Sequence, residues 1–268
     1  MPSMLFDSLA HPTCNGKWIG NRSGGTHEEV ALDLARHGYS GALAVGLPGV
    51  GDYEHTKFMA MTKQHADLIP VAALTRYESR DLIARDLDEI VGQGFRIVKI
   101  HPRLLNYEKT LEVLPVMVRE CVDRHLAVML CTYPEYQSVI KPGEALRKMA
   151  EAISTEPAGY FMTMHSGVLD PMLFAEIAKN SDHVILDFSL SLLKYPHPVR
   201  GFLEVFAKEI PQSICLGSDG PEWTYNQVVT ELDRISAQNG LDAAGRLGGQ
   251  NAWDWLQSVS DWQRRGNF

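Results

Sequence analysis

The sequence predicts an α/β fold, a single (β/α)8 TIM barrel with a C-terminal closing helix, from three observations. Eight short apolar segments alternate with longer amphipathic segments, and parallel strands need such crossover connections. The length of 268 residues fits the roughly 250 residues of one barrel. The first strand–helix connection contains no GxGxxG, which argues against a doubly wound dinucleotide-binding sheet. We therefore expect residues 1–268 to form one domain.

The predicted strands are rich in Val, Ile, Leu, Phe and Met and end in small or polar residues. Because each is short and is followed by an amphipathic segment, each starts one strand–helix unit. They are Met4–His11, Ala42–Leu47, Ile69–Thr75, Arg96–His101, Ala127–Thr132, Tyr160–His165, His183–Ser189 and Ser213–Ser218.

Two predicted helices carry clear boundary signals. Thr26–His37 begins with a capping box that pairs Thr26 with Glu29, and Ser79–Val91 begins at a serine N-cap. The residues from Leu241 onward contain three tryptophans and predict a closing helix packed on the barrel. The remaining predicted helices are Tyr53–Ala66, which has the weakest pattern, Glu108–His125, Gly143–Ile153, Asp170–Lys179, Pro198–Lys208 and Glu222–Gln238.

Composition excludes several classes of protein. With 25 Lys and Arg against 33 Asp and Glu, the net charge is -8, and no basic patch predicts a nucleic-acid partner. The four cysteines form no CxxC pair, which favours a reducing compartment. The N-terminal residues lack a secretory pattern, and no apolar run reaches the ~18 residues of a membrane span. We therefore expect a cytoplasmic protein without a membrane partner.

Polar residues stand where several predicted strands end, and in this architecture the active site lies at the C-terminal strand ends. Alternation places Asp7, Leu9 and His11 on one face of the first strand. Packing or turn formation explains any one of these polar residues. The complete set is harder to explain in this way, because burying unpaired charges costs several kcal/mol. The residues expected to converge are His11, Lys99, His101, Cys131, His165 and Asp219.

These motifs, in their order along the chain, resemble the amidohydrolase superfamily, and specifically its amidohydrolase-2 branch. LFDSLAHPT is similar to the D-x-H-x-H start, GFRIVKIHPR to G-F-x-G-x-K-x-H-P, and ICLGSDGPE to G-S-D-x-P. VMLCTYPE, FMTMHSG and HVILDFS are similar to the fifth, sixth and seventh strands, and RLGGQNAWDWL to the terminal helix. The resemblance implies a barrel with a divalent metal at its mouth. The branch contains metal-dependent hydrolases and carboxymuconate-semialdehyde decarboxylase-like enzymes.

The resemblance also implies site residues. His11, His165 and Asp219 match family positions, whereas Leu9 stands at the first ligand histidine and Cys131 at the strand-five histidine. Cysteine thiolate binds Zn²⁺ well, so the three remaining ligands for one Zn²⁺ or another divalent metal would be His11, Cys131 and Asp219. The two departures from the pattern favour a metal-free site.

The sequence predicts a hydrolase of a small carbonyl compound, namely a lactone, an ester or a cyclic amide. Asp219 is the predicted general base, and His165 the acid or electrophile. Two alternatives stay open: a decarboxylase of a small unsaturated or aromatic acid, and a non-catalytic protein that binds a small ligand. Cys131 is a metal ligand, a nucleophile activated by His165, or a packing residue.

Residues near the predicted strand ends suggest how a substrate is held. We expect substrate binding by Lys99, His101, Arg103 and Tyr133. Cations at these positions favour a small molecule that carries a carboxylate, which arginine binds through two parallel hydrogen bonds. A homodimer is suggested by analogy with other barrels alone.

Overall fold

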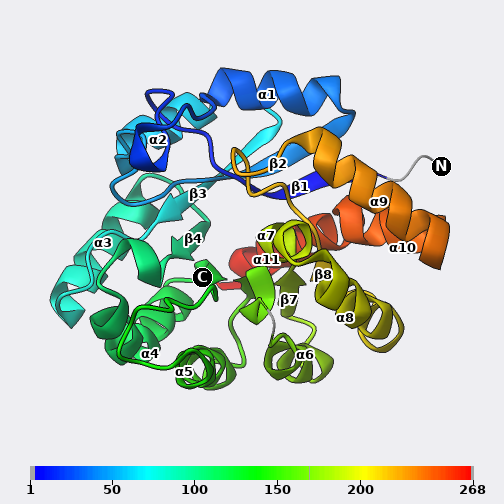
Figure 1. Cartoon of the computed structure of the whole chain (residues 1–268). Coiled ribbons are helices and arrows are strands. Elements are labelled where there is room, and N and C mark those ends of the chain that lie inside the picture. Colours follow the sequence, from blue (N-terminus) through cyan, green and yellow to red (C-terminus); the bar gives the residue numbers. More distant parts are fainter. Residues whose placement is uncertain (1–3, 169, 267–268) are drawn as a thin grey trace.

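The computed structural model describes residues 4–168 and 170–266 (Figure 1). Eight parallel strands form one sheet in sequence order, so the predicted (β/α)8 barrel is confirmed. Each strand lies within a residue or a few of its predicted bounds. The strands are β1 (Leu5–Ala10), β2 (Tyr39–Val45), β3 (Leu68–Ala73), β4 (Ile97–Ile100), β5 (Ala127–Cys131), β6 (Phe161–Met164), β7 (Val184–Asp187) and β8 (Ile214–Cys215).

Most helices form an outer ring around the strands, whereas α7 (Ser189–Lys194) and α11 (Asn251–Gly266) lie across its centre in this view (Figure 1). The predicted capping box is confirmed, since Glu29 N donates to Thr26 Oγ1 at 3.3 Å and Thr26 N donates to Glu29 Oε2 at 2.7 Å. Among the helices described, none is long and apolar enough to cross a membrane. They are α1 (His27–Arg36), α2 (His55–Thr62), α3 (Arg80–Gly92), α4 (Tyr107–Asp123), α5 (Pro142–Ser154), α6 (Met172–Lys179), α7 (Ser189–Lys194), α8 (Pro196–Glu209), α9 (Tyr225–Asn239), α10 (Leu241–Gly245) and α11 (Asn251–Gly266).

The predicted closing helix is α11, and it covers the N-terminal end of the barrel. Trp255 Nε1 donates to the carbonyl of His183, just before β7. Gln263 Nε2 donates to the carbonyls of Arg96 and His125, just before β4 and β5. One face of α11 also packs against the barrel interior. The helix therefore closes one end, and the C-terminal strand ends face away from it.

The barrel closes where β1 meets the segment after β8. Asp219 N donates to the carbonyl of Leu9 at 2.8 Å, and His11 N donates to the carbonyl of Gly220 at 2.9 Å. A parallel bridge joins Ala10 to Gly220. This closure places Asp219 next to His11 although 208 positions separate them in the sequence.

Gly217 sits at this closure, where no side chain fits. A Cβ there would lie 2.6 Å from Leu9 N and 2.8 Å from Asp7 Oδ1. We expect Gly217→Ala to lower the free energy of unfolding by about 1–3 kcal/mol, because backbone would have to shift. Gly201→Ala, at an open and exposed position of α8, is the matched control, and its helix should tolerate alanine. Urea unfolding measures both, and equal stability of the two variants would contradict the prediction.

The expectation that Asp7 and Leu9 share a face of β1 is wrong. The pairing of β1 with β2 shifts register between Leu5 and Asp7 and again before Ala10. Such irregularities break strict alternation. Leu9 consequently packs in the barrel interior, whereas the Asp7 carboxylate accepts hydrogen bonds from Ser218 Oγ at 2.6 Å and from the Tyr225 hydroxyl of α9 at 3.0 Å.

Asp7 is expected to make stability depend on pH. Burial raises its pKa to about 6, although hydrogen bonds from Ser218, Leu9 and Tyr225 oppose this. The folded state thus binds the proton more tightly than the unfolded chain, in which the pKa of Asp7 is 3.8. Stability contributed by Asp7 is therefore present at low pH and is lost as the pH rises from about 4 to about 6, by roughly 3 kcal/mol.

Asp7→Asn should remove this loss, because an uncharged amide has no proton to release. We expect the variant to be more stable than wild type at pH 7 but not at pH 4, as measured by urea unfolding. Asp33→Asn, at a carboxylate that is about half exposed, is the control and should keep the wild-type profile. A difference between wild type and Asp7→Asn that did not change with pH would exclude this role for Asp7.

Candidate active site

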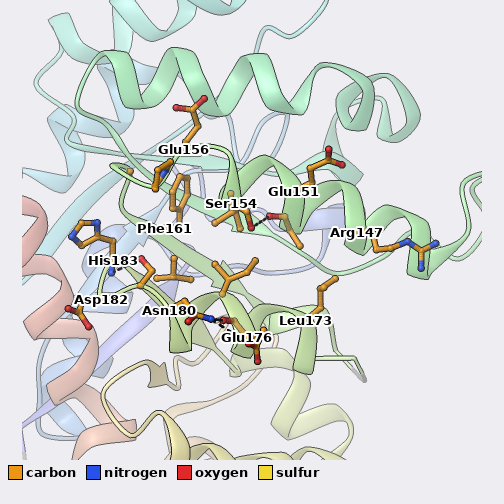
Figure 2. A pocket seen from close by; sticks show the side chains of 17 residues that line it. Arg147, Glu151, Ser154, Glu156, Phe161, Leu173, Glu176, Asn180, Asp182 and His183 are labelled. Carbon is orange, nitrogen blue, oxygen red and sulfur yellow. Dashed lines mark hydrogen bonds between the residues drawn. The ribbon is translucent and has the colours of Figure 1, made fainter.

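Two large cavities lie in different parts of the barrel, one between outer helices and one beside the barrel mouth. A cavity of about 710 Å³ lies between α5 and α6, lined by Arg147, Glu151, Glu176 and His183 among others (Figure 2). It is near the N-terminal ends of β6 and β7, and no predicted site residue lines it. A second cavity of about 660 Å³ is lined in part by His11 and by the segment after β8. Of these two cavities, the second is the one lined by a predicted site residue, His11.

The ends of five strands bring ionisable side chains together at the C-terminal mouth. They are all buried, with Lys99 only 1% exposed. Lys99 Nζ has no hydrogen-bond partner among the described residues. Burial lowers the pKa of Lys99, while Cys131, Asp219 and Asp187 oppose this, so these groups lie within electrostatic reach of one another. The residues that share the mouth are Lys99, Cys131, His165, Asp187 and Asp219.

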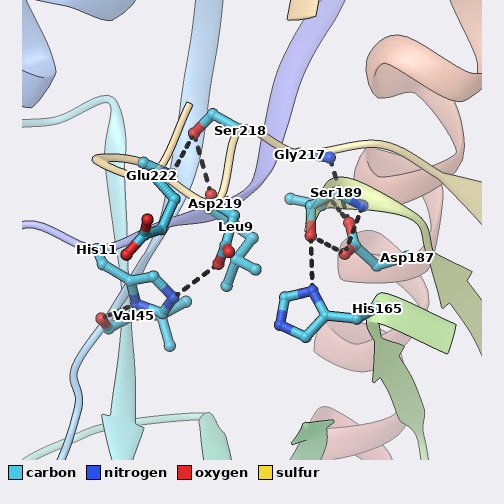
Figure 3. Close-up of polar contacts among 12 residues, drawn as sticks. Leu9, His11, Val45, His165, Asp187, Ser189, Gly217, Ser218, Asp219 and Glu222 are labelled. Carbon is cyan, nitrogen blue, oxygen red and sulfur yellow. Dashed lines mark hydrogen bonds and ion pairs between the residues drawn. The ribbon is translucent and has the colours of Figure 1, made fainter. Parts of the chain in front are cut away.

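His11 and Asp219 form one side of this site (Figure 3). His11 Nδ1 donates to the carbonyl of Val45 at 2.8 Å, and Nε2 lies 3.4 Å from Asp219 Oδ1. Burial opposes ionisation of Asp219, but His165, His11 and Lys99 outweigh it and hold its pKa below the usual value. Asp219 is therefore a carboxylate at neutral pH and is able to accept a proton.

His165 and Ser189 form the other side (Figure 3). Ser189 Oγ donates to Asp187 Oδ1 at 2.5 Å and lies 3.2 Å from His165 Nδ1. A carboxylate only accepts, so the serine proton points to Asp187 and the serine oxygen accepts from Nδ1–H. In the neutral imidazole, Nε2 therefore carries the lone pair and acts as a base.

Asp187 is fixed by contacts from three elements. Its Oδ2 accepts from Ser8 Oγ at 2.6 Å and from Gly217 N at 3.2 Å, and its Oδ1 accepts from Ser189 N at 3.1 Å. The sequence analysis did not identify Asp187, Ser189 or Ser8 as site residues. The available signal was the aspartate at the end of the seventh predicted strand, in HVILDFS.

Cys131 lies at the end of the strand next to that of His165. It pairs in register with Met164, the residue before His165. Burial opposes the thiolate, but His165, Lys99 and Arg103 outweigh it and lower the pKa of Cys131 to about 7. The alternative of a nucleophile activated by His165 stays open.

The other predicted binding residues lie around the same mouth. The Tyr133 ring is 6.1 Å from the His165 ring and 4.7 Å from the Arg103 guanidinium carbon, and the Tyr133 hydroxyl accepts a hydrogen bond from Lys194 Nζ at 2.8 Å. Arg103 also pairs with Glu135 at 3.7 Å, so it is partly neutralised. Burial, with Lys99 and Arg103, lowers the pKa of His101 to about 3, so this imidazole is neutral. Lys99 is thus the cation best placed to receive an anion.

The predicted metal ligands do not form a three-ligand site. Within residues 4–168 and 170–266, the group of three whose ligand atoms lie within 4.8 Å of one another is His55, Asp86 and Glu89, and Arg76 already pairs with both acids. His11, Cys131 and Asp219 do not meet this spacing. In addition, the buried Lys99 ammonium repels a divalent cation and Leu9 offers no ligand. The residues present do not fit a metal held by this set.

No protein-family model matches the sequence, and no curated protein matches it. Solved structures do match. An uncharacterized TIM-barrel protein from Bordetella bronchiseptica has a TM-score of 0.74 at 15% identity and covers 96% of this chain and 99% of its own. A probable 2-pyrone-4,6-dicarboxylic acid hydrolase from Acinetobacter baumannii has a TM-score of 0.62 at 14% identity and covers 96% of this chain and 100% of its own. The lactonase from Listeria monocytogenes has a TM-score of 0.60 at 13% identity and covers 93% of each chain.

The chain shares its barrel fold with these structures. The resemblance proposed from the sequence is thereby confirmed at the level of the barrel. These identities are too low to transfer an activity, since one barrel hosts many reactions. The reaction has to be argued from the site residues themselves.

Proposed function

We propose that the protein is a hydrolase that opens a small lactone or activated ester carrying a carboxylate. The observation that carries this proposal is the buried Lys99 ammonium, which has no hydrogen-bond partner in the described part of the chain and lies near the Asp219 carboxylate. An unpaired buried ammonium is costly. An anionic substrate group, or the oxyanion that forms on a carbonyl under attack, would compensate it.

The two sides of the site supply the proton transfers of hydrolysis. Asp219 is ionised and accepts a proton from water. Nε2 of His165 accepts the proton that the attacking nucleophile loses as it adds to the carbonyl, and returns that proton to the leaving oxygen when the bond to this oxygen breaks. His165 is thus a base before it is an acid, which refines the role expected from the sequence.

The comparisons support this substrate class. One structural neighbour is named a lactonase, and another, named a probable 2-pyrone-4,6-dicarboxylic acid hydrolase, was solved with citric acid bound. A pyrone is an activated lactone, and its carboxylates suit an anion-binding lysine. Such carbonyls need less activation than amides, which suits a site without a three-ligand metal set.

Hydrolysis of 2-pyrone-4,6-dicarboxylate and of simple lactones, followed by absorbance and NMR with and without a chelator, tests the proposal. We expect ring opening with incorporation of oxygen from labelled water, insensitivity to the chelator, and slower turnover of uncharged lactones. Release of carbon dioxide would indicate the decarboxylase instead. Absence of turnover with binding of the carboxylates would indicate a non-catalytic binding protein.

A further inference from the structure

One connected chain of side chains runs from the end of β5 to the end of β7. Cys131 pairs in register with Met164, the residue before His165, and His165 Nδ1 lies 3.2 Å from Ser189 Oγ, which donates to Asp187. We propose that Cys131 is the nucleophile of the hydrolase proposed above, and this assignment rests on that proposed function. In this assignment His165 Nε2 takes the thiol proton, and Ser189 and Asp187 are positioning residues for the imidazole.

The direction of the hydrogen bonds supports a thiol nucleophile. Because Nδ1 holds the ring proton, neutral His165 has no proton at Nε2 to give to a leaving group. It must first take one, and the thiol of Cys131 on the neighbouring strand carries one. A nucleophile beside a base that is oriented by a third group is the arrangement of covalent catalysis.

The electrostatic surroundings distinguish Cys131 from the other cysteines. All four are free, and burial raises the pKa of Cys14, Cys121 and Cys215. Cys131 is equally buried, but here His165, Lys99 and Arg103 reverse the direction. Lys99, with its unpartnered ammonium, is an independent indication that an anion belongs beside this thiol.

The reaction balances as two acyl transfers. The thiol proton passes to His165 Nε2, sulfur attacks the carbonyl carbon, and Lys99 stabilises the oxyanion. Collapse breaks the bond to the leaving oxygen, which takes the proton from His165 and leaves a thioester on Cys131. Water then gives its proton to Asp219 and attacks the thioester, and collapse releases the acid and the thiolate, which recovers the proton.

Access to the thiol requires the cover over it to move. Cys131 packs with Tyr133 and Val168 and is fully buried, and Lys194 and Arg103 hold the Tyr133 ring in place. Tests of reactivity are therefore made on wild type and on Tyr133→Ala, in which the ring is removed.

The first test measures alkylation of each cysteine by iodoacetamide at pH 7 with peptide mapping. In both proteins Cys131 should react at least about fivefold faster than Cys121 and Cys215, because its greater thiolate fraction outweighs its lower intrinsic nucleophilicity. Ser189→Ala and Asp187→Asn should slow this reaction, and Ser189→Thr, which keeps the hydroxyl, should restore it. Equal rates at the three buried cysteines in Tyr133→Ala, or no effect of Ser189→Ala, would overturn the assignment.

The second test traps the intermediate. After reaction with p-nitrophenyl acetate and an acid quench, wild type should carry a hydroxylamine-sensitive acetyl group on Cys131, which Cys131→Ala and Cys131→Ser cannot form as a thioester. Cys121→Ala is the matched control. If turnover were lost in Asp219→Asn but kept in Cys131→Ala, the proposed hydrolase function would stand and the assignment of Cys131 as nucleophile would be overturned. Failure of wild type to hydrolyse any ester or lactone would instead contradict the proposed function, while the alkylation rates still decide the role of Cys131.

Discussion

Asp219→Asn should lower kcat by about 10³-fold, the contribution of a well-placed general base. Asparagine keeps the shape of the side chain but cannot accept the proton from water. The Asp219 backbone N–H, which bonds to the carbonyl of Leu9, is unchanged, so the barrel closure should persist. Steady-state kinetics with circular dichroism would separate loss of chemistry from loss of fold.

A nearby carboxylate provides the control for this experiment. Glu222 lies three residues on, and its side chain binds Trp18 and Arg22 rather than a group of the proposed chemistry. Glu222→Gln should leave kcat nearly unchanged. Turnover of Asp219→Asn close to that of wild type would show that another group activates the water.

Lys99→Met should reduce activity and raise stability together. Loss of the group that stabilises the oxyanion should lower kcat by about 10²–10³-fold. At the same time, the pKa of Lys99 is lowered in the fold by burial, even with the attraction of Cys131, Asp219 and Asp187 included. The charged form is thus disfavoured in the folded state, and methionine should increase the free energy of unfolding by about 1–4 kcal/mol.

Thermal or urea unfolding measured beside kinetics checks both parts of this prediction. Lys63→Met is the control, because Lys63 is exposed and lies far along the chain from the mouth residues. It should alter neither quantity appreciably. If Lys99→Met were less stable than wild type, Lys99 would be a paired structural residue; unchanged kinetics would remove it from the site.

The sequence indicated the barrel because its evidence is local and repeated. Eight apolar segments, capping signals such as Thr26 with Glu29, and the tryptophan-rich C-terminal segment each depend on near neighbours in the chain. The residues at the strand ends could be located for the same reason. Lys99, Cys131 and Asp219 follow from the position of each strand alone.

Other features depended on contacts that span much of the chain. Alternation along β1 failed for Asp7, because the register shifts as the strand pairs with β2. Helix α7 is only six residues long and carries Ser189 at its start, and so short a segment has no periodicity to detect. Ser189 was missed for this reason, whereas Asp187 stands at the end of β7, inside the seventh predicted strand.

By itself, then, the sequence determined the number and order of the strand–helix units and the polar residues at their ends, because local patterns of hydrophobicity carry that information. Only the tertiary structure decided the partners of those residues. It placed His165 beside Ser189 and Asp219 beside His11, and it left Lys99 without a hydrogen-bond partner among the described residues. Donor and acceptor roles follow from such contacts, and barrel closure is the physical step that creates them.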